Sequence, residues 1–557
     1  MSKAFRYALS ATMLILVVLE IWRPYFFLTD DNLSGTFPFL TEIGRRMGSG
    51  QSPFVSHYVF NGNYNLFFDI GAINWHPVFI LISLFANTWW HNWIIDFSCA
   101  AISLMSASGF VLLGLTVRRE LNLTLSDAWI AFLAVSYTFS MYGLSISVSW
   151  VTEYGSLAAM PWLALALFQP TWKRVLLVTA AAFVNAVLIG HPEAAISTFV
   201  WLTLLSLGIC RWRRAWWPVF SWIGGHALAC IILTPILFPA LWGFLHTLRS
   251  VGLDISQMGS RNMSPLGMLT SYFMGGWAYR VGAPLVAMNG PQAYLGGMAA
   301  SLAGLAIIPV VICRKRWSTL EISCVGVLTL LVFMIIRPVW VNEILIHLPV
   351  FKSFRWPFRE LMQLLFFTHL LFLLRLPACG KWAAWVVGAG AVWFFSPLIG
   401  YAPPSFDDFP TDRALILGGQ ADAYWREVRP LLDPSAPTVS VFANEEVLTS
   451  GMNYQLLPFT FINTYNYPDL FHVRSISGYS LTAPENQLGT EVVPPFQFGG
   501  FFPDQIAAMT LLGTKCNQLE ITSDGPLQII LKRPDGKVID LTPIVNKYLR
   551  QITWIYQ

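Results

Sequence analysis

Long apolar runs recur along the chain and stop near residue 400. Several of these runs are about 20 residues long, which matches the roughly 30 Å hydrocarbon core of a bilayer. They predict membrane-spanning helices near residues 7–28, 93–116, 128–146, 155–168, 175–190, 194–210, 217–242, 294–313, 319–336, 360–375 and 382–400. We therefore expect a polytopic α-helical membrane protein with about 11 spans.

Basic residues between the runs predict the orientation of the spans. They occur at 118–120, 172–174, 211–214 and 314–316, and at Arg375 with Lys381. With a cytoplasmic N-terminus and an uncleaved first span, the positive-inside rule places all of them in the cytoplasm. The apolar segment 76–90 is too short for a span, and counting it as one would invert every later loop. We therefore predict a re-entrant or interfacial segment within the first outer loop, residues 29–92.

The pattern changes after Tyr401, where polar residues alternate with short β-like runs. "TVSVFA" reads as a strand, and "LQIILKRPDGKVIDL" reads as two strands joined by an Asp-Gly hairpin turn. The sequence thus predicts a transmembrane domain, residues 1–400, followed by an α+β extracytoplasmic domain, residues 401–557.

The composition supports a membrane protein and argues against a soluble protein and a nucleic-acid-binding protein. Of 557 residues, 55% are hydrophobic and 11% are charged, whereas soluble domains carry about 25% charged residues. The formal charge of +4 is small for this length, and no nucleic-acid-binding motif is present. The seven cysteines show neither a disulfide framework nor zinc-ligand spacing.

Polar residues in and beside the predicted spans collect on the outer side. They are Asp30, Asp31, His76, Glu153, His191, Glu193, Lys352, Arg355, Arg359 and Glu360. A carboxylate there can act as a general base toward an acceptor hydroxyl, and arginines can hold a phosphate with two hydrogen bonds. Other interpretations stay open. The aspartates could cap the next segment or only mark the end of the span, and "GHPE" at 190–193 could be a simple turn. The basic residues of "FKSFRWPFRE" could simply anchor the chain to lipid headgroups. The metal is unassigned and no cofactor is certain, although one or two carboxylates would suffice for Mg²⁺ or Mn²⁺.

The order of short motifs resembles the bacterial YfhO-like membrane proteins of the GT-C glycosyltransferase superfamily. The motifs are Asp31 with Pro38 seven residues later, "NWHP" at 74–77, "GHPE" at 190–193, "YLGG" at 294–297, "LPVFKSFRWPFRE" at 348–360, "SGYS" at 477–480 and "LLGTKC" at 511–516. Each motif alone is weak, but together they follow the family's order over nearly the whole chain.

The resemblance implies a GT-C-like fold in the bacterial inner membrane with an extracytoplasmic active site. It implies a polyprenyl-phosphate-linked sugar as donor, and an envelope glycan, lipid or protein as acceptor. Asp31 would be the catalytic base, with Asp30 as its neighbour or substitute. Arg355 and Arg359 would be the family's paired arginines, with Lys352 beside them at the donor phosphate, and His191 and Glu193 match the family's His-Pro turn.

Two other function classes remain as alternatives. A transporter or flippase of lipid-linked glycans would more often carry ionisable or broken helices near the middle of the membrane. An envelope-assembly scaffold would account for the C-terminal region but not for the collected acids and arginines. We therefore expect a glycosyltransferase acting among membrane lipids.

Overall fold

The computed structural model describes most of the chain. The described residues are 2–53, 55–56, 58, 64–65, 75–245, 316–345, 347, 357–379, 410–442, 460–461, 467–475, 500–501, 515–522 and 528–552. They divide into two compact units, which we call the helical unit and the mixed unit. The helical unit comprises Met1–Ile21, Cys99–Leu237 and Val251–Ser405, and the mixed unit comprises Trp22–Ser98, Phe238–Ser250 and Phe406–Gln557.

The described residues form six helices long and apolar enough to cross a membrane. They are α1 (Lys3–Trp22), α4 (Ile94–Glu120, preceded by the 3-10 turn η5, His91–Trp93), α8 (Trp172–Ile189), α9 (Pro192–Arg213), α10 (Trp217–Leu245) and α15 (Thr319–Ile336). The shorter helices between or after them are α5 (Asp127–Thr138), α6 (Met141–Ser147), α7 (Val151–Leu167), α16 (Val339–Leu345), η10 (Pro357–Glu360) and α17 (Leu361–Cys379). The chain is therefore a polytopic membrane protein. The spans predicted at 294–313 and 382–400 lie outside the described residues.

Four predicted spans differ from the helices observed. Those at 155–168 and 360–375 fold as α7 and α17, which are not among the six helices long and apolar enough to cross a membrane. Helix α1 ends at Trp22 rather than near residue 28, because Pro24 offers no backbone N–H and disfavours a helical conformation at Arg23. The span predicted at 128–146 is two helices, α5 and α6, bent by 46°. Ser140 has an extended backbone and its hydroxyl accepts a hydrogen bond from the Gly143 N–H at 3.2 Å, so it starts a new helix inside the apolar run.

The basic turns at Arg118 and Arg213 lie at one end of the helical unit. Asp127 at the start of α5 accepts a hydrogen bond from the Ala4 backbone N–H at 3.0 Å and pairs with Arg118 at 2.7 Å. Glu120, in the same last turn of α4 as Arg118, lies 3.8 Å from Arg213 at the end of α9. We call this the basic end of the helical unit. Since α9 ends there, its first residues lie at the opposite end.

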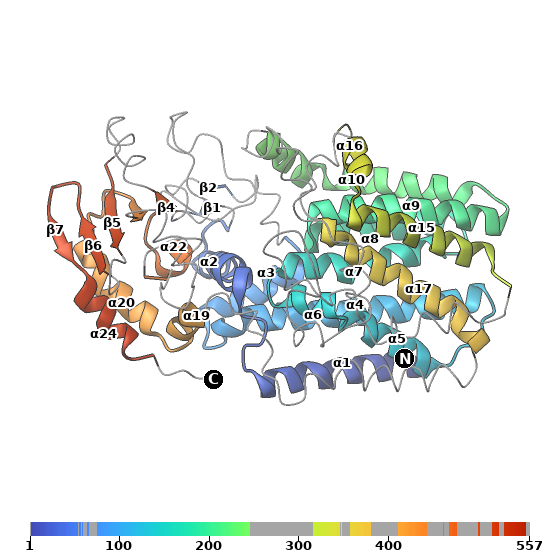
Figure 1. Ribbon diagram of the computed structural model, residues 1–557, viewed down its shortest axis with the longest axis horizontal. Coiled ribbons are helices and arrows are strands. Elements are labelled where there is room, and N and C mark those ends of the chain that lie inside the picture. The colour runs from blue at the N-terminus through green and yellow to red at the C-terminus, as the bar shows by residue number, and fades with distance from the viewer. Residues whose placement is uncertain are drawn as a thin grey trace. The chain divides into compact units, whose positions relative to one another are not determined.

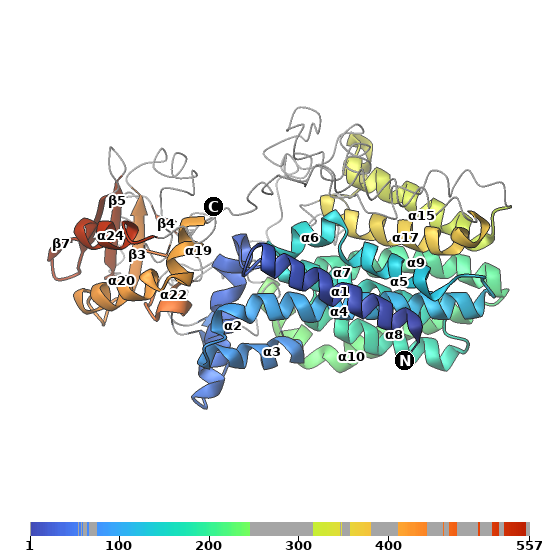
Figure 2. The same cartoon turned by 90° about the horizontal axis from the view of Figure 1, so that it is seen from below.

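Helix α15 packs against α9 and α17 along the helical unit, and α7 packs against α8 (Figures 1 and 2). The two helices are in close contact where α7 begins and α8 ends. A Cβ atom on Gly155 would lie 2.2 Å from the Ile189 carbonyl oxygen, so only glycine permits this approach. The Ser156 hydroxyl accepts a hydrogen bond from the His191 N–H at 2.7 Å. This packing fixes the turn between α8 and α9 beside the first turn of α7.

The mixed unit joins segments from the first predicted loop to segments near the C-terminus. Helix α2 (Phe37–Gly48), preceded by the π-helical turn η1 (Asn32–Thr36), packs against α3 (Pro77–Ser83), η4 (Leu84–Asn87) and α22 (Tyr467–Phe471). The Arg45 Nη1 donates to the Leu470 carbonyl at 2.8 Å, and the Arg413 Nη2 donates to the Pro24 carbonyl at 2.7 Å. The predicted boundary at residues 400–401 lies outside the described residues.

The segment predicted to be re-entrant or interfacial folds as α3 and η4. Together they cover Pro77–Asn87 and are too short to cross a membrane. The prediction that this segment is not a full span is therefore confirmed. Leu81 and Trp89 are 65% and 76% exposed. Their exposure is compatible with an interfacial position, which stays a prediction.

A five-stranded sheet completes the mixed unit, in the order β4-β3-β5-β6-β7. Its strands are β3 (Thr438–Phe442), β4 (Gly500–Phe501), β5 (Asn517–Thr522), β6 (Gln528–Lys532) and β7 (Val538–Asp540); a separate pair is β1 (Val55–Ser56) with β2 (Tyr64–Asn65). Strand β3 is parallel to β4 and β5, whereas β5, β6 and β7 are antiparallel. The remaining helices are α19 (Pro410–Leu417), α20 (Gln420–Val428), η12 (Arg429–Leu431) and α24 (Thr542–Leu549).

The local β-structure expected from the sequence is present. "TVSVF", residues 438–442, forms β3, and the predicted Asp-Gly turn joins β6 to β7. Gly536 has φ +83, a left-handed conformation that favours glycine, and its N–H donates to the Arg533 carbonyl at 3.0 Å. Both predictions are confirmed.

A buried charged cluster lies on α2 in the mixed unit. Glu42 is 5% exposed, 3.7 Å from Arg46 and 3.6 Å from the His472 imidazole. Burial raises the Glu42 pKa to about 7, although Arg46 and Arg45 oppose the shift. Burial also lowers the pKa of His472 to about 4. Near neutral pH this contact therefore holds a partly protonated carboxyl and a neutral imidazole.

We expect Gly155→Ala to destabilise the helical unit by about 1–3 kcal/mol, because the new methyl group would force α7 away from the end of α8. Thermal unfolding of the purified full chain in detergent measures this. Gly326→Ala is the matched control in another helix, α15, where a Cβ would meet no atom within 4 Å; it should be neutral or slightly stabilising. Equal unfolding temperatures for the two variants would contradict the packing described.

Glu42→Gln should stabilise the protein increasingly as the pH rises from about 4.5 to 7. A raised carboxyl pKa means that the folded state favours the protonated form, so its stabilising contribution is complete below the unfolded pKa and is lost as pH rises through about 7. Melting curves of wild type and variant at pH 5 and pH 8 test this.

Glu427→Gln is the control, and its effect on stability should depend on pH in the opposite direction. Lys547 and Tyr548 lower the pKa of the exposed Glu427, so Glu427→Gln should lower the melting temperature at pH 8 more than at low pH. A Glu42→Gln effect that is the same at both pH values would show that Glu42 titrates normally.

Candidate active site

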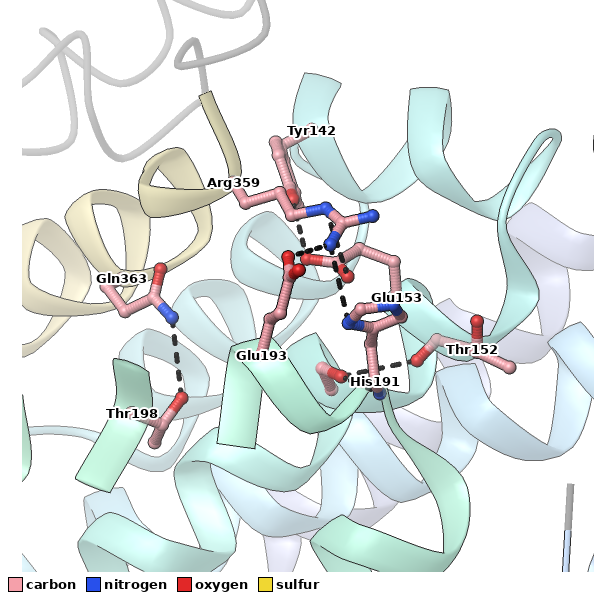
Figure 3. A network of polar contacts seen from close by, with 9 residues as sticks. Tyr142, Thr152, Glu153, His191, Glu193, Thr198, Arg359 and Gln363 are labelled. Carbon is pink, nitrogen blue, oxygen red and sulfur yellow. Dashed lines mark hydrogen bonds and ion pairs between the residues drawn. The ribbon is translucent and has the colours of Figure 1, made fainter. Parts of the chain in front are cut away.

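Arg359 lies at the centre of a polar cluster at the end of the helical unit opposite the basic end (Figure 3). Its Nη1 pairs with the Glu193 carboxylate in a short contact and lies 3.4 Å from the His191 Nδ1. Its Nε lies 3.9 Å from the Glu153 Oε2. The guanidinium carbon is 5.6 Å from the centre of the Trp150 ring, within cation–π range. Three segments, the starts of α7, α9 and α17, thus meet at one guanidinium group.

One face of α9 carries the partners of the segment that holds Arg359. Glu193, Ser197 and Trp201 follow each other at intervals of four residues, so they lie on the same side of the helix. Glu360 accepts hydrogen bonds from Ser197 at 2.8 and 2.9 Å and from the Trp201 indole at 2.7 Å. Because Glu360 is the neighbour of Arg359, these bonds fix the start of α17 against α9.

The same helix contact continues one turn further along α17. Gln363 Nε2 donates to the Thr198 hydroxyl at 3.4 Å, as Figure 3 shows. Arg337, buried after the last turn of α15, adds a second positive charge that acts on Glu360 and Glu193. Three carboxylates and two guanidinium groups are therefore gathered within this site.

Glu153 lies at the bottom of the cluster and is 1% exposed. The Tyr142 hydroxyl donates to its Oε1 at 3.2 Å. Its position depends on the close packing at Gly155, one half-turn further along α7. A buried carboxylate needs a nearby positive charge, and Arg359 supplies it.

The contact between Arg359 and His191 specifies the state of the imidazole. A guanidinium has no acceptor, so the His191 Nδ1 must accept and carry no proton. The ring is then neutral with its proton on Nε2. His191 is 5% exposed, and its backbone N–H is held by Ser156.

The structure brings together four of the residues predicted from the sequence: Glu153, His191, Glu193 and Arg359. Asp30, Asp31 and His76 belong to the mixed unit, and Lys352 and Arg355 lie outside the described residues. His76 caps α3, its Nδ1 accepting from the Val78 N–H at 3.3 Å.

Asp30 and Asp31 begin the helical segment that leads into α2. Asp30 has a left-handed backbone with φ +46. Asp31 precedes the π-helical turn η1, and its side chain makes no capping hydrogen bond there. The capping interpretation thus finds no support at Asp31.

Eight residues described in the cluster were not among the predicted site residues: Tyr142, Trp150, Ser197, Thr198, Trp201, Arg337, Glu360 and Gln363. The Tyr, Ser, Thr, Trp and Gln residues among them lie in apolar stretches, where such side chains are common in membrane helices and do not indicate a site. The four-residue spacing of Glu193, Ser197 and Trp201 is the sequence signal that could have identified the α9 face.

No group of three or more His, Cys, Asp or Glu side chains suited to a metal ion occurs among the residues that the structure describes. The question of Mg²⁺ or Mn²⁺ stays open, because such ions can bind through fewer protein ligands.

No protein-family model matches the sequence, and no curated protein is detectably similar to it. Among solved structures, ArnT from Cupriavidus metallidurans in the apo state is similar to the chain with a TM-score of 0.41 and 14% sequence identity. The alignment covers 92% of each chain. A similarity at this level does not assign an activity.

Proposed function

We propose that the protein is an integral-membrane glycosyltransferase that moves a sugar from a polyprenyl-phosphate-linked donor to an extracytoplasmic acceptor. The acceptor is an envelope glycan, a glycolipid or a protein. The observation that carries the proposal is the contact between the "RWPFRE" and "GHPE" motifs, in which Arg359 meets Glu193 and His191. The two motifs are far apart in the sequence and both belong to the YfhO-like pattern.

The distribution of charge supports an extracytoplasmic site. The basic turns at Arg118 and Arg213 lie at one end of the helical unit, and the Arg359 cluster lies at the other. By the positive-inside rule the basic end faces the cytoplasm of the bacterial inner membrane. The Arg359 cluster then faces outward, on the side where lipid-linked sugars are used.

The proposed chemistry divides between two groups of residues. Asp31, or its neighbour Asp30, removes the proton from the acceptor hydroxyl as that oxygen attacks the anomeric carbon. The bond from this carbon to the phosphate oxygen breaks, and the polyprenyl phosphate leaves with the electron pair. Arg359, with Arg355 and Lys352, binds the phosphate of the donor and stabilises the negative charge that grows on it.

Asp31→Asn should lower sugar transfer roughly 10²–10⁴-fold if Asp31 is the base, because the amide cannot accept the proton. The measurement is transfer of labelled sugar from polyprenyl-phosphate donors to an envelope acceptor fraction in membranes, with Asp30→Asn beside it. Asp535→Asn, in the exposed β6–β7 turn, should leave transfer unchanged. Loss in one variant identifies the base. No transfer by the folded wild type from any donor would favour the transporter or scaffold functions.

Arg359→Lys should raise the KM for the donor roughly tenfold while the protein still folds, since lysine keeps the charge but loses the planar pair of donors. Steady-state kinetics with a varied donor concentration test this. Arg118→Lys, at the basic end, is the matched control and should leave the KM unchanged. An unaltered donor KM in Arg359→Lys would remove Arg359 from the donor site.

A further inference from the structure

The Arg359 side chain is only partly engaged by its neighbours. Within the part of the chain that the structure describes, its hydrogen bonds to Glu193 and His191 both use Nη1. Its Nε is buried and makes no hydrogen bond there, and its ion pair with Glu153 spans 3.9 Å. A guanidinium has five N–H donors on three nitrogens. Arg359 therefore keeps donor capacity for a further anion.

The side-chain exposures indicate from which side an anion would reach Arg359. Those of Arg359 and Glu193 are 14% and 19% exposed, whereas that of Glu153 is 1% exposed. Glu193 thus lies at the accessible edge of the cluster and Glu153 at its base. An anion entering the site meets the Glu193 carboxylate at the guanidinium first.

The charge of the cluster opposes a second anion. Two carboxylates, Glu153 and Glu193, already pair with the Arg359 guanidinium. A phosphate added beside Glu193 would increase the negative charge in a poorly solvated site, where like charges repel strongly. One carboxylate must therefore move away or lose its hold on Arg359 when a phosphate binds.

Glu193 is the carboxylate best placed to do so. Glu153 is held by Tyr142 at 3.2 Å, and Glu360 by Ser197 and Trp201 at 2.7–2.9 Å. Glu193 is in the first turn of α9 and has the most exposed side chain of the Arg359 ion pairs. Its release would leave Arg359 with one carboxylate, Glu153.

We propose that Glu193 is a resident counter-ion of Arg359 that competes with the phosphate of the lipid-linked donor. The proposal rests on the proposed function for the identity of the ligand as a lipid phosphate. In the free protein the Glu193 carboxylate neutralises Arg359. When the donor binds, its phosphate accepts the hydrogen bonds of the Arg359 guanidinium. The Glu193 side chain then turns away from Arg359 toward the solvent-exposed edge of the cluster. Glu193 thereby sets the affinity of the site for lipid phosphate without contacting the reacting atoms.

The test measures binding of farnesyl phosphate, a short prenyl phosphate, to the purified full chain in detergent. Glu193→Gln should bind it roughly tenfold more tightly than wild type, because the competing charge is gone while Glu153 still balances Arg359. Farnesol, which has the same chain and no phosphate, should bind both proteins equally. An unchanged or weaker affinity for farnesyl phosphate in Glu193→Gln overturns the proposal.

Glu120→Gln is the matched control. Glu120 also pairs with an arginine, Arg213, and its side chain is also 19% exposed, but it lies at the basic end. Its substitution should leave farnesyl phosphate binding unchanged. An equal gain in Glu120→Gln would show a general effect of net charge and would overturn the proposal.

A double variant tests whether the gain passes through Arg359. Glu193→Gln combined with Arg359→Gln replaces the ion pair by two neutral amides. The tenfold gain in farnesyl phosphate affinity should then disappear. A gain that persists without Arg359 overturns the proposal.

Sugar transfer by the wild type, measured separately, distinguishes a failure of the proposed glycosyltransferase function from a failure of the proposed role of Glu193. A wild type that transfers no sugar, together with tighter farnesyl phosphate binding by Glu193→Gln, would remove the proposed function and retain Glu193 as the competitor of a lipid phosphate.

Discussion

The guanidinium of Arg359, largely withdrawn from water with 14% of its side chain exposed, is the constraint on which the end of the helical unit depends. A positive charge taken out of water needs opposite charge close by. Here α7 supplies Glu153 and α9 supplies Glu193. Because these helices must deliver their carboxylates to one point, the starts of α7, α9 and α17 are fixed relative to one another. The electrostatic need of one side chain thus determines how three helix ends meet.

The apolar spans were largely predictable, because the length of an apolar run is set by the thickness of the bilayer. What the runs do not encode is where a helix stops within them. Pro24 could have placed the end of α1 at Trp22, since its effect on the preceding residue is local. The break at Ser140 was harder to predict, because one serine in an apolar run only caps a helix if its backbone becomes extended.

Four charged members of the candidate site were predictable, whereas Arg337, Glu360 and the neutral members were not among the predicted site residues. Glu153, His191, Glu193 and Arg359 are conspicuous in apolar surroundings, where ionisable groups are costly. Tyr142, Ser197 and Trp201 are common in membrane helices, so nothing in their identity marks them. Their roles follow from contacts between segments distant in the sequence, such as Ser197 with Glu360, and such pairings are set by the tertiary structure. Lys352 and Arg355 stay predictions.

The approach of α7 to α8 also limits how this protein can change. The atom that faces Gly155 is the carbonyl oxygen of Ile189, which belongs to the backbone. No exchange of the Ile189 side chain can move that oxygen, so a larger residue at position 155 has no direct compensating substitution on the facing helix. During evolution, a side chain of the Arg359 cluster can be substituted together with its partner. Gly155, which sets the distance between α7 and α8, has to stay glycine.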